Sequence, residues 1–286
     1  MEYINLQKAV DALSSMSRCS ICIHDVSGIL RKPVLSLKYE NRIHSGKFCD
    51  LAKSTQKGYD TCVHCKSCAN RRAVWKAEAF GGMCAYGLYE MVKPVIIEGR
   101  AVCIIYLGNL IMDQEKTGNK LKKTCTETGA PCQEMEALLE NCVCHISKQQ
   151  ALLICEFLDS YIRMLYEKYK DETEEETTYH WAVEQLKLYV DNNYHQSFTL
   201  ESVCSLYFIN EKYAGSLFKK QMGMTFHEYL NQVRLKKAAE QLPDIKKKVI
   251  DIAVSCGFNN VTYFNKKFME YYGQTPGAYR RKLISV

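Results

Sequence analysis

Two stretches decide the fold of the C-terminal part of this chain: Phe208–Tyr229 (FINEKYAGSLFKKQMGMTFHEY) and Phe258–Tyr279 (FNNVTYFNKKFMEYYGQTPGAY). They align at an offset of 50 residues. The matching pairs are Phe208 and Phe258, Asn210 and Asn260, Tyr213 and Tyr263, Phe218 and Phe268, Gly223 and Gly273, Thr225 and Thr275, and Tyr229 and Tyr279. So many bulky and turn-forming residues in register indicate an internal repeat.

Each copy of the repeat has the pattern of a helix, a tight turn and a second helix. The first unit is expected over about residues 199–222 and the second over about 248–272, with a glycine ending each second helix. In the second unit we expect Asn259 to cap the second helix, and Tyr263 and Tyr271 to pack inward. Two helices joined by so short a turn suit the major groove of DNA.

A longer helix is predicted between the two units. Thr225 and Glu228 form a capping box at its start, and Pro243 follows its last residue. About seventeen residues at 1.5 Å each give a rigid spacer of roughly 25 Å. With the width of the flanking units, such a spacer could place the two recognition helices in successive major grooves, which are about 34 Å apart.

The positive charge of the chain is concentrated beside this repeat. The net charge is +6, and residues 179–286 carry all of the excess, with 15 Lys or Arg against 9 Asp or Glu. The first 178 residues hold 23 of each sign. A basic C-terminal region is expected of a domain that neutralises DNA phosphates.

Residues 181–282 resemble the DNA-binding domain of the AraC family over its full length. The residues that carry the resemblance include Leu217–Lys220, Gly223–Phe226, Tyr229–Leu230, Arg234–Leu235, Ile252–Ala253, Gly257–Phe258, Tyr263–Phe264, Phe268, Gly273, Thr275–Pro276 and Tyr279–Arg280. The resemblance implies that an exposed face near the start of each recognition helix contacts bases. The predicted DNA contacts are Lys212, Ser216, Lys219, Lys220, Asn260, Thr262, Asn265 and Lys266. It also favours an activator that acts with RNA polymerase.

The first unit departs from the family pattern. An Arg or Gln is common where Gly215 and Ser216 stand, and Gly215 offers no side chain to a base edge. We therefore expect the first unit to contact mainly phosphates. The second unit keeps Asn265 and Lys266, which can reach acceptors in the groove.

An acidic segment separates the two halves of the chain. Residues 169–178 are predicted to be a solvated linker between a sensory domain over 1–168 and the DNA-binding domain over 179–286. Just before it, apolar residues recur at heptad spacing: Ala151, Cys155, Leu158, Ile162, Leu165 and Tyr169. This stripe fits either a helix that forms a homodimer or a helix packed on its own sensory domain.

The N-terminal half has the pattern of an α+β domain. Helices are predicted over 1–18, 47–54 and 60–79, and strands over 20–26 and 80–107, with a hairpin around Glu98–Gly99. Helices flanking an antiparallel sheet indicate a PAS- or GAF-like sensor. The predicted fold class is thus such a sensor followed by an all-α double helix-turn-helix domain.

Roughly residues 5–168 resemble the PocR sensory domain. The resemblance rests on Phe48–Cys49, Cys62, Cys84–Leu88, Pro94–Ile96 and Gly108–Asn109. It implies a sensor of a small-molecule effector, which in the namesake is thought to be a diol. Cys49, Cys84 and Tyr86 are the candidate ligand-binding residues. A histidine is usual where Ala85 stands, so the identity of the ligand does not carry over.

Thirteen of the 15 cysteines precede residue 179. Cys62, Cys65 and Cys68 have ferredoxin-like spacing, with Cys49 and Cys84 as candidate fourth ligands of zinc or an iron–sulfur cluster. If residues 60–79 are helical, the three thiols can converge only where the first turn unwinds. A second set, Cys125, Cys132, Cys142, Cys144 and His145, matches no familiar ligand spacing. Buried apolar thiols and reactive thiols are the alternatives for the cysteines, and His24, His44 and His64 are expected at the surface.

These patterns predict a cytoplasmic one-component transcription regulator rather than an enzyme. The chain has no phosphate-binding glycine loop and no nucleophile motif. It also lacks an apolar run long enough for a membrane span and a basic leader. The alternatives are a regulator that senses metal or redox state through cysteines, and a thiol or iron–sulfur enzyme fused to a DNA-binding domain.

Overall fold

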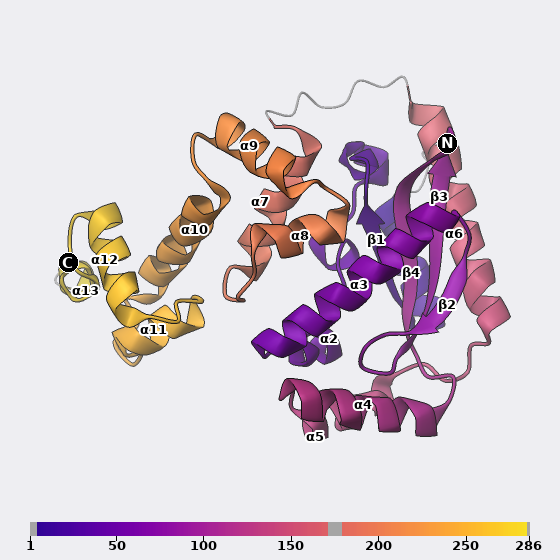
Figure 1. Ribbon diagram of the computed structural model, residues 1–286, viewed down its shortest axis with the longest axis horizontal. Coiled ribbons are helices and arrows are strands. Elements are labelled where there is room, and N and C mark those ends of the chain that lie inside the picture. The colour runs from indigo at the N-terminus through magenta and orange to yellow at the C-terminus, as the bar shows by residue number, and fades with distance from the viewer. Residues whose placement is uncertain (1–4, 171–178, 285–286) are drawn as a thin grey trace. The chain divides into compact units, whose positions relative to one another are not determined.

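The computed structural model describes residues 5–170 and 179–284, which form two compact units (Figure 1). The N-terminal unit is Met1–Trp181 with Ser205–Phe208, and the C-terminal unit is Ala182–Cys204 with Ile209–Val286. Most of the predicted acidic linker, residues 171–178, lies outside the described residues. No helix among the described residues is both long and apolar enough to cross a lipid bilayer.

The N-terminal unit is an α+β structure built on one sheet. Its elements in chain order are α1 (Leu6–Ser17), β1 (Ser20–Asp25), α2 (Lys47–Ala52), α3 (Gln56–Lys76), β2 (Phe80–Met83), β3 (Tyr89–Ile97), β4 (Arg100–Leu110), α4 (Gln114–Thr128), α5 (Cys132–Leu138) and α6 (Lys148–Tyr169). Short 3-10 helices occupy Ile29–Arg31, Pro33–Leu35, Tyr39–Asn41 and Leu139–Asn141.

The sheet is four-stranded and antiparallel, in the order β1-β4-β3-β2. The predicted hairpin around Glu98–Gly99 is confirmed, because β3 and β4 pair up to Ile97 and Arg100 on either side of it. Glu98 and Gly99 have φ angles of 49° and 76°. Two consecutive residues with positive φ are typical of the tight turns whose twist matches that of antiparallel strands.

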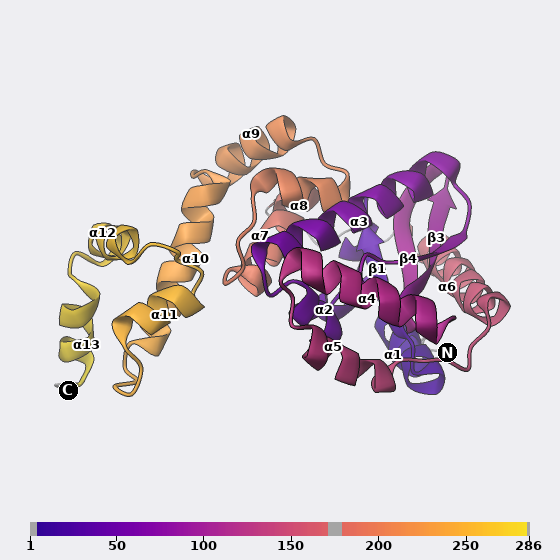
Figure 2. The same ribbon diagram turned by 60° about the horizontal axis from the view of Figure 1, so that its bottom comes forward.

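Both faces of the sheet are covered by helices, with α3 on one face and α6 on the other (Figures 1 and 2). The side chains of β1 alternate between the two faces and show why both need covering. Ile21 and Ile23 pack into the core formed with α1 and α6. Cys22 points the other way and packs with Tyr106 and Ala73 of α3. A strand of apolar residues on both sides is what a doubly covered sheet requires.

The heptad stripe of α6 is part of the core of its own unit. Five of its six residues are completely buried in the cluster that α1, α6 and the sheet share, namely Ala151, Cys155, Leu158, Ile162 and Leu165, and Tyr169 is partly buried against it. Of the two interpretations of the stripe, packing on its own domain is therefore correct. The stripe itself is not available for pairing with a second chain.

A smaller apolar cluster joins α2, α4 and α5. Phe48 of α2, Leu121 of α4 and Met135 of α5 are buried together with Tyr86 and Leu88, which lie between β2 and β3. This cluster holds α2 and the Cys84–Leu88 loop in place. Both segments line the cavity described below.

The C-terminal unit is entirely helical. Its elements are α7 (Trp181–Asn193), α8 (Leu200–Tyr207), α9 (Glu211–Met222), α10 (Phe226–Gln241), α11 (Val249–Ser255), α12 (Val261–Tyr272) and α13 (Pro276–Ile284), except that Trp181 of α7 and the end of α8 from Ser205 are assigned to the N-terminal unit. The two predicted helix-turn-helix units correspond to α8–α9 and α11–α12. The predicted long helix between them is α10, and its capping box of Thr225 and Glu228 is present.

The sequence repeat is reproduced in the capping of α9 and α12. The side chain of Asn210 accepts a hydrogen bond from the backbone N–H of Tyr213, and Asn260 accepts one from Tyr263. Gly223 and Gly273 end the two helices with φ angles of 71° and 70°, a left-handed conformation that favours glycine.

Three expectations for the second unit were wrong. Asn260 and not Asn259 caps α12. Tyr263 and Tyr271 are each 42% exposed, whereas they were expected to pack inward. Their hydroxyls meet polar side chains of α10, Asn231 and Gln232 respectively, at 3.0 Å. A tyrosine at the edge of a core keeps its ring partly covered and its hydroxyl hydrogen-bonded, and sequence periodicity does not distinguish this position from a buried one.

Candidate functional site

The N-terminal unit contains a cavity of about 420 Å³ on the α3 side of the sheet. Strands β1, β3 and β4, the segment from His44 into α2, the first half of α3 and the loop after β2 all contribute to its walls. Its size lies in the range of small-molecule sites. The wall combines apolar side chains, such as Phe48 and Leu88, with a buried charged group.

That charged group is the ion pair between Lys66 of α3 and Glu90 of β3. The two side chains are only 5% and 12% exposed. Burial opposes ionisation of both groups, but the attraction between the two opposite charges is the stronger effect. Lys66 therefore holds the pKa of Glu90 well below its usual range, and Glu90 raises the pKa of Lys66. Glu90 also accepts a hydrogen bond from Nδ1 of His44 at 3.2 Å. The cavity thus has a fixed polar end.

Four of the five predicted cysteine ligands line this cavity. Cys49, Cys62, Cys65 and Cys84 do so, whereas Cys68 is exposed and is not among the lining residues. The helix α3 runs without interruption through Cys62, so its first turn does not unwind to bring the α3 thiols together. A metal site formed by these cysteines stays a prediction.

The thiols of Cys49, Cys62 and Cys84 are in the wrong environment for nucleophiles. Burial raises the pKa of Cys49 to about 12, and burial likewise raises the pKa of Cys62 and Cys84. A thiol that stays protonated at neutral pH reacts slowly with electrophiles and oxidants. The sulfur atoms of these cysteines therefore form a compact, polarisable part of the cavity wall.

Tyr86, the third predicted ligand residue, lies in the cavity wall but is only 2% exposed. Its hydroxyl donates a hydrogen bond to the carbonyl of Ala52 at 2.8 Å and lies 3.2 Å from Oγ1 of Thr128. Because the hydroxyl is already engaged, Tyr86 fixes the shape of the wall between α2 and α4.

Sequence reasoning missed the histidines. His24 is 4% exposed, and the side chain of His44 is 12% exposed, although both were expected at the surface. His64 is exposed, as expected. The alternation of β1 could have identified His24, because it lies on the same face as the buried Cys22. His44 lies outside any helix or strand, and no periodic pattern identifies it.

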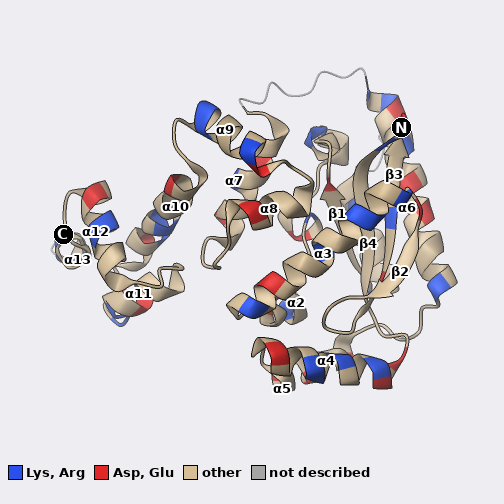
Figure 3. Ribbon diagram, viewed as in Figure 1, with Lys and Arg blue, Asp and Glu red and all other residues tan. Residues whose placement is uncertain are grey.

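The other candidate site is the surface of α9 and α12. Lys212, Ser216, Lys219 and Lys220 are exposed on α9, and Thr262, Asn265 and Lys266 are exposed on α12. Lys and Arg residues mark α9, α10 and α12 (Figure 3). Asn260 is exposed as well, but its side chain is used to cap α12. Among the described residues, none hydrogen-bonds to the side chain of Asn265 or Lys266, so both can contact a ligand.

Comparisons with known proteins agree with this division. Residues 203–282 match a helix-turn-helix domain family, and residues 2–169 match the family described as a sensory domain found in PocR. The pairing of a sensory domain with a double helix-turn-helix domain defines a class, the DNA-binding transcription regulators. The chain belongs to the AraC family of transcriptional regulators and carries a PocR sensory domain.

Several regulators are similar to about a third of this chain. The activator RhaR of Pectobacterium carotovorum is 37% identical over 89 residues, which are 31% of each chain. The regulatory protein PocR of Salmonella typhimurium is 34% identical over 95 residues, 33% of this chain and 31% of PocR. The chain thus spans about a third of the length of the curated relatives that it matches. The C-terminal domain of a response regulator, yesN of Fusobacterium nucleatum, is 35% identical and aligns over 35% of this chain and 97% of its own length, with a TM-score of 0.33.

Proposed function

We propose that the chain is a cytoplasmic transcription activator whose binding to DNA is controlled by a small-molecule effector held in the cavity. The observation that carries this proposal is the cavity of about 420 Å³, which is lined largely by apolar side chains and has the Lys66–Glu90 pair in its wall. An effector with a hydrogen-bonding group at one end and apolar atoms at the other would match it. The name of RhaR as an activator supports activation.

The proposed division is a sensory domain over 1–168, a linker over 169–178 and a DNA-binding domain over 179–286. The antiparallel sheet with helices on both faces supports a PAS- or GAF-like description of the sensory domain. We expect the regulator to work as a homodimer, to contact an operator in two successive major grooves, to act with RNA polymerase and to have no catalytic activity of its own. An effector can control it only by binding two arrangements of the protein unequally.

A redox sensor that uses the cavity cysteines is the weaker candidate. Burial raises the pKa of Cys49, Cys62 and Cys84, which makes them poor targets for oxidants. No comparable observation favours an enzyme. The effector proposal is therefore the one to test first.

The effector proposal is tested with ligands and with a substitution that fills the cavity. A panel of small polyols and carboxylic acids is first screened for compounds that raise the melting temperature of the full chain, since a ligand of the folded state stabilises it. Ala85→Leu adds three carbon atoms to the cavity wall and should abolish the shift. Ala137→Leu makes the same change at an exposed position of α5 and should keep it. A shift that persists in Ala85→Leu would place the effector elsewhere.

A further inference from the structure

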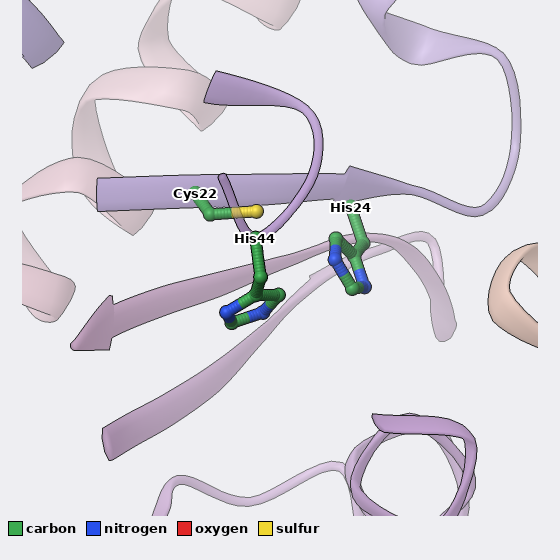
Figure 4. A group of neighbouring side chains, drawn as sticks. All are labelled: Cys22, His24 and His44. Atoms are coloured by element: carbon green, nitrogen blue, oxygen red, sulfur yellow. The ribbon is translucent and has the colours of Figure 1, made fainter. Parts of the chain in front are cut away.

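Beside the cavity lies a cluster of three side chains that effector binding does not explain. Cys22 and His24 are two residues apart on β1 and therefore share a face, and His44 comes from the segment before α2 (Figure 4). The sulfur of Cys22 and one ring nitrogen of each histidine all lie within 4.8 Å of one another. All three residues lie on the α3 side of the sheet.

His44 has a free lone pair in this cluster. Its Nδ1 lies 3.2 Å from Oε1 of Glu90, so Nδ1 carries the proton and donates to the carboxylate. Its Nε2 is then a lone-pair acceptor, and it is buried with no hydrogen-bond partner among the described residues. A buried polar atom without a protein partner is uncommon and is usually satisfied by a bound water or ion. A histidine that binds a metal through one ring nitrogen commonly donates a hydrogen bond from the other nitrogen to a carboxylate.

The corresponding hydrogen-bond partner of His24 is the side-chain amide of Asn70 on α3. The hydroxyl of Tyr106 donates to Oδ1 of Asn70, and Nδ1 of His24 lies 3.3 Å from the same oxygen. The Nδ2 of Asn70 lies 3.1 Å from Nδ1, so either tautomer of His24 can be hydrogen-bonded. With the proton on Nδ1, Nε2 offers a lone pair.

We propose that Cys22, His24 and His44 bind one zinc(II) ion, with a fourth coordination position open to the cavity. One thiolate and two imidazoles are a typical zinc donor set, whereas magnesium and calcium prefer oxygen ligands. Ligand atoms around tetrahedral zinc are about 3.4–3.8 Å apart, so the cluster closes with shifts of about 1 Å. Cys22 and His44 line the cavity, which puts the open position there.

The charges around the cluster permit a cation. The ammonium group of Lys66 acts on the cluster, but Glu90 neutralises it in a buried ion pair. Loss of the Cys22 proton to the metal would offset one of the two positive charges of zinc. The remaining charge favours an anionic or neutral oxygen or sulfur ligand at the open position. The zinc site itself does not depend on the effector proposal.

The test begins with the full chain stripped of metal by a chelator and reloaded with zinc(II) or with cobalt(II) as a spectroscopic probe. We expect one metal ion per chain by elemental analysis and a thiolate-to-cobalt charge-transfer band. X-ray absorption of the zinc-loaded chain should give one sulfur and two imidazole nitrogens in the first coordination sphere. Three or four sulfur ligands would overturn the assignment in favour of the other cavity cysteines.

Variants with matched controls make the test specific. Cys22→Ser should remove the charge-transfer band, and His44→Ala should remove stoichiometric binding. His44 lies in a loop, so its variant should keep the helix content of the parent chain. Cys65→Ser and Cys68→Ser, on α3, should bind metal as the parent does. A folded parent chain that takes up no metal, or a His44→Ala variant that binds it unchanged, would refute the proposal.

Discussion

At the scale of single residues, the Lys66–Glu90 pair has the largest expected effect on the sensory domain. Both side chains are buried between α3 and β3, and each keeps the other ionised. The pair costs desolvation, but removal of one partner leaves a buried charge without compensation. Since the wall of the cavity depends on this pair, its loss should affect both stability and ligand binding.

Lys66→Met should therefore destabilise the folded state by about 3–5 kcal/mol, as measured by urea unfolding at pH 7. Combining it with Glu90→Gln should recover most of the loss, because no charge is then left unpaired. Since Lys66 lowers the pKa of Glu90 in the folded state, the stabilisation in the parent chain is complete above the ordinary glutamate pKa of about 4.3 and is lost as the pH falls further. A single variant as stable as the double variant would show that the pair contributes nothing.

At the scale of elements, α6 shows how one sequence pattern fits two structures. A heptad stripe predicts only that one side of a helix is apolar, and it does not say which surface covers that side. Here the sheet of the same unit covers it. The opposite side of α6 is partly apolar as well, with Leu153 57% exposed.

Leu158→Ala should thus destabilise the folded state by about 2–5 kcal/mol, because it leaves a cavity in a completely buried site. Leu153→Ala is the same change on the same helix at an exposed position and should cost less than about 0.5 kcal/mol. Urea unfolding of the two variants measures the difference. Equal effects, or a change in oligomeric state with Leu158→Ala alone, would show that the stripe faces a second chain.

Over the whole molecule, the PocR sensory domain and the helix-turn-helix domain occupy different parts of the chain, and the charge differs between them. The excess of positive charge lies in residues 179–286, whereas the first 178 residues are balanced. Within the DNA-binding domain, the two helix-turn-helix units repeat their caps and glycines, but they do not repeat the side chains exposed on α9 and α12. The two units should therefore contribute differently to specificity.

The double change Asn265→Ala and Lys266→Ala should lose base discrimination at one groove of the operator, by about 1–3 kcal/mol for each good contact. Ser216→Ala should change little, and Lys219→Ala should weaken binding to all sequences alike. Binding to single-base operator variants at fixed salt measures these effects. If Ser216→Ala relaxes base preference more than the double change does, the assignment of the two units is reversed.

The amino-acid sequence alone was sufficient to predict the helix-turn-helix repeat, the glycines that end its second helices, the capping box of Thr225 and Glu228, the Glu98–Gly99 hairpin and the split in charge. Apart from the charge, which is a matter of composition, these features are local or periodic along the chain. It also selected four cysteines that line the cavity, although not the geometry that they have there.

The surroundings of Cys22, His24 and His44 depend on tertiary packing and could not be predicted from the sequence. The partners of this cluster come from α3, β3 and β4, and their side chains meet only when the sheet is formed and α3 covers it. The same holds for the exposure of Tyr263 and for the surface that covers the α6 stripe. Burial and hydrogen bonding between distant segments depend on how elements pack, and a pattern along one segment carries no information about the segment that will face it.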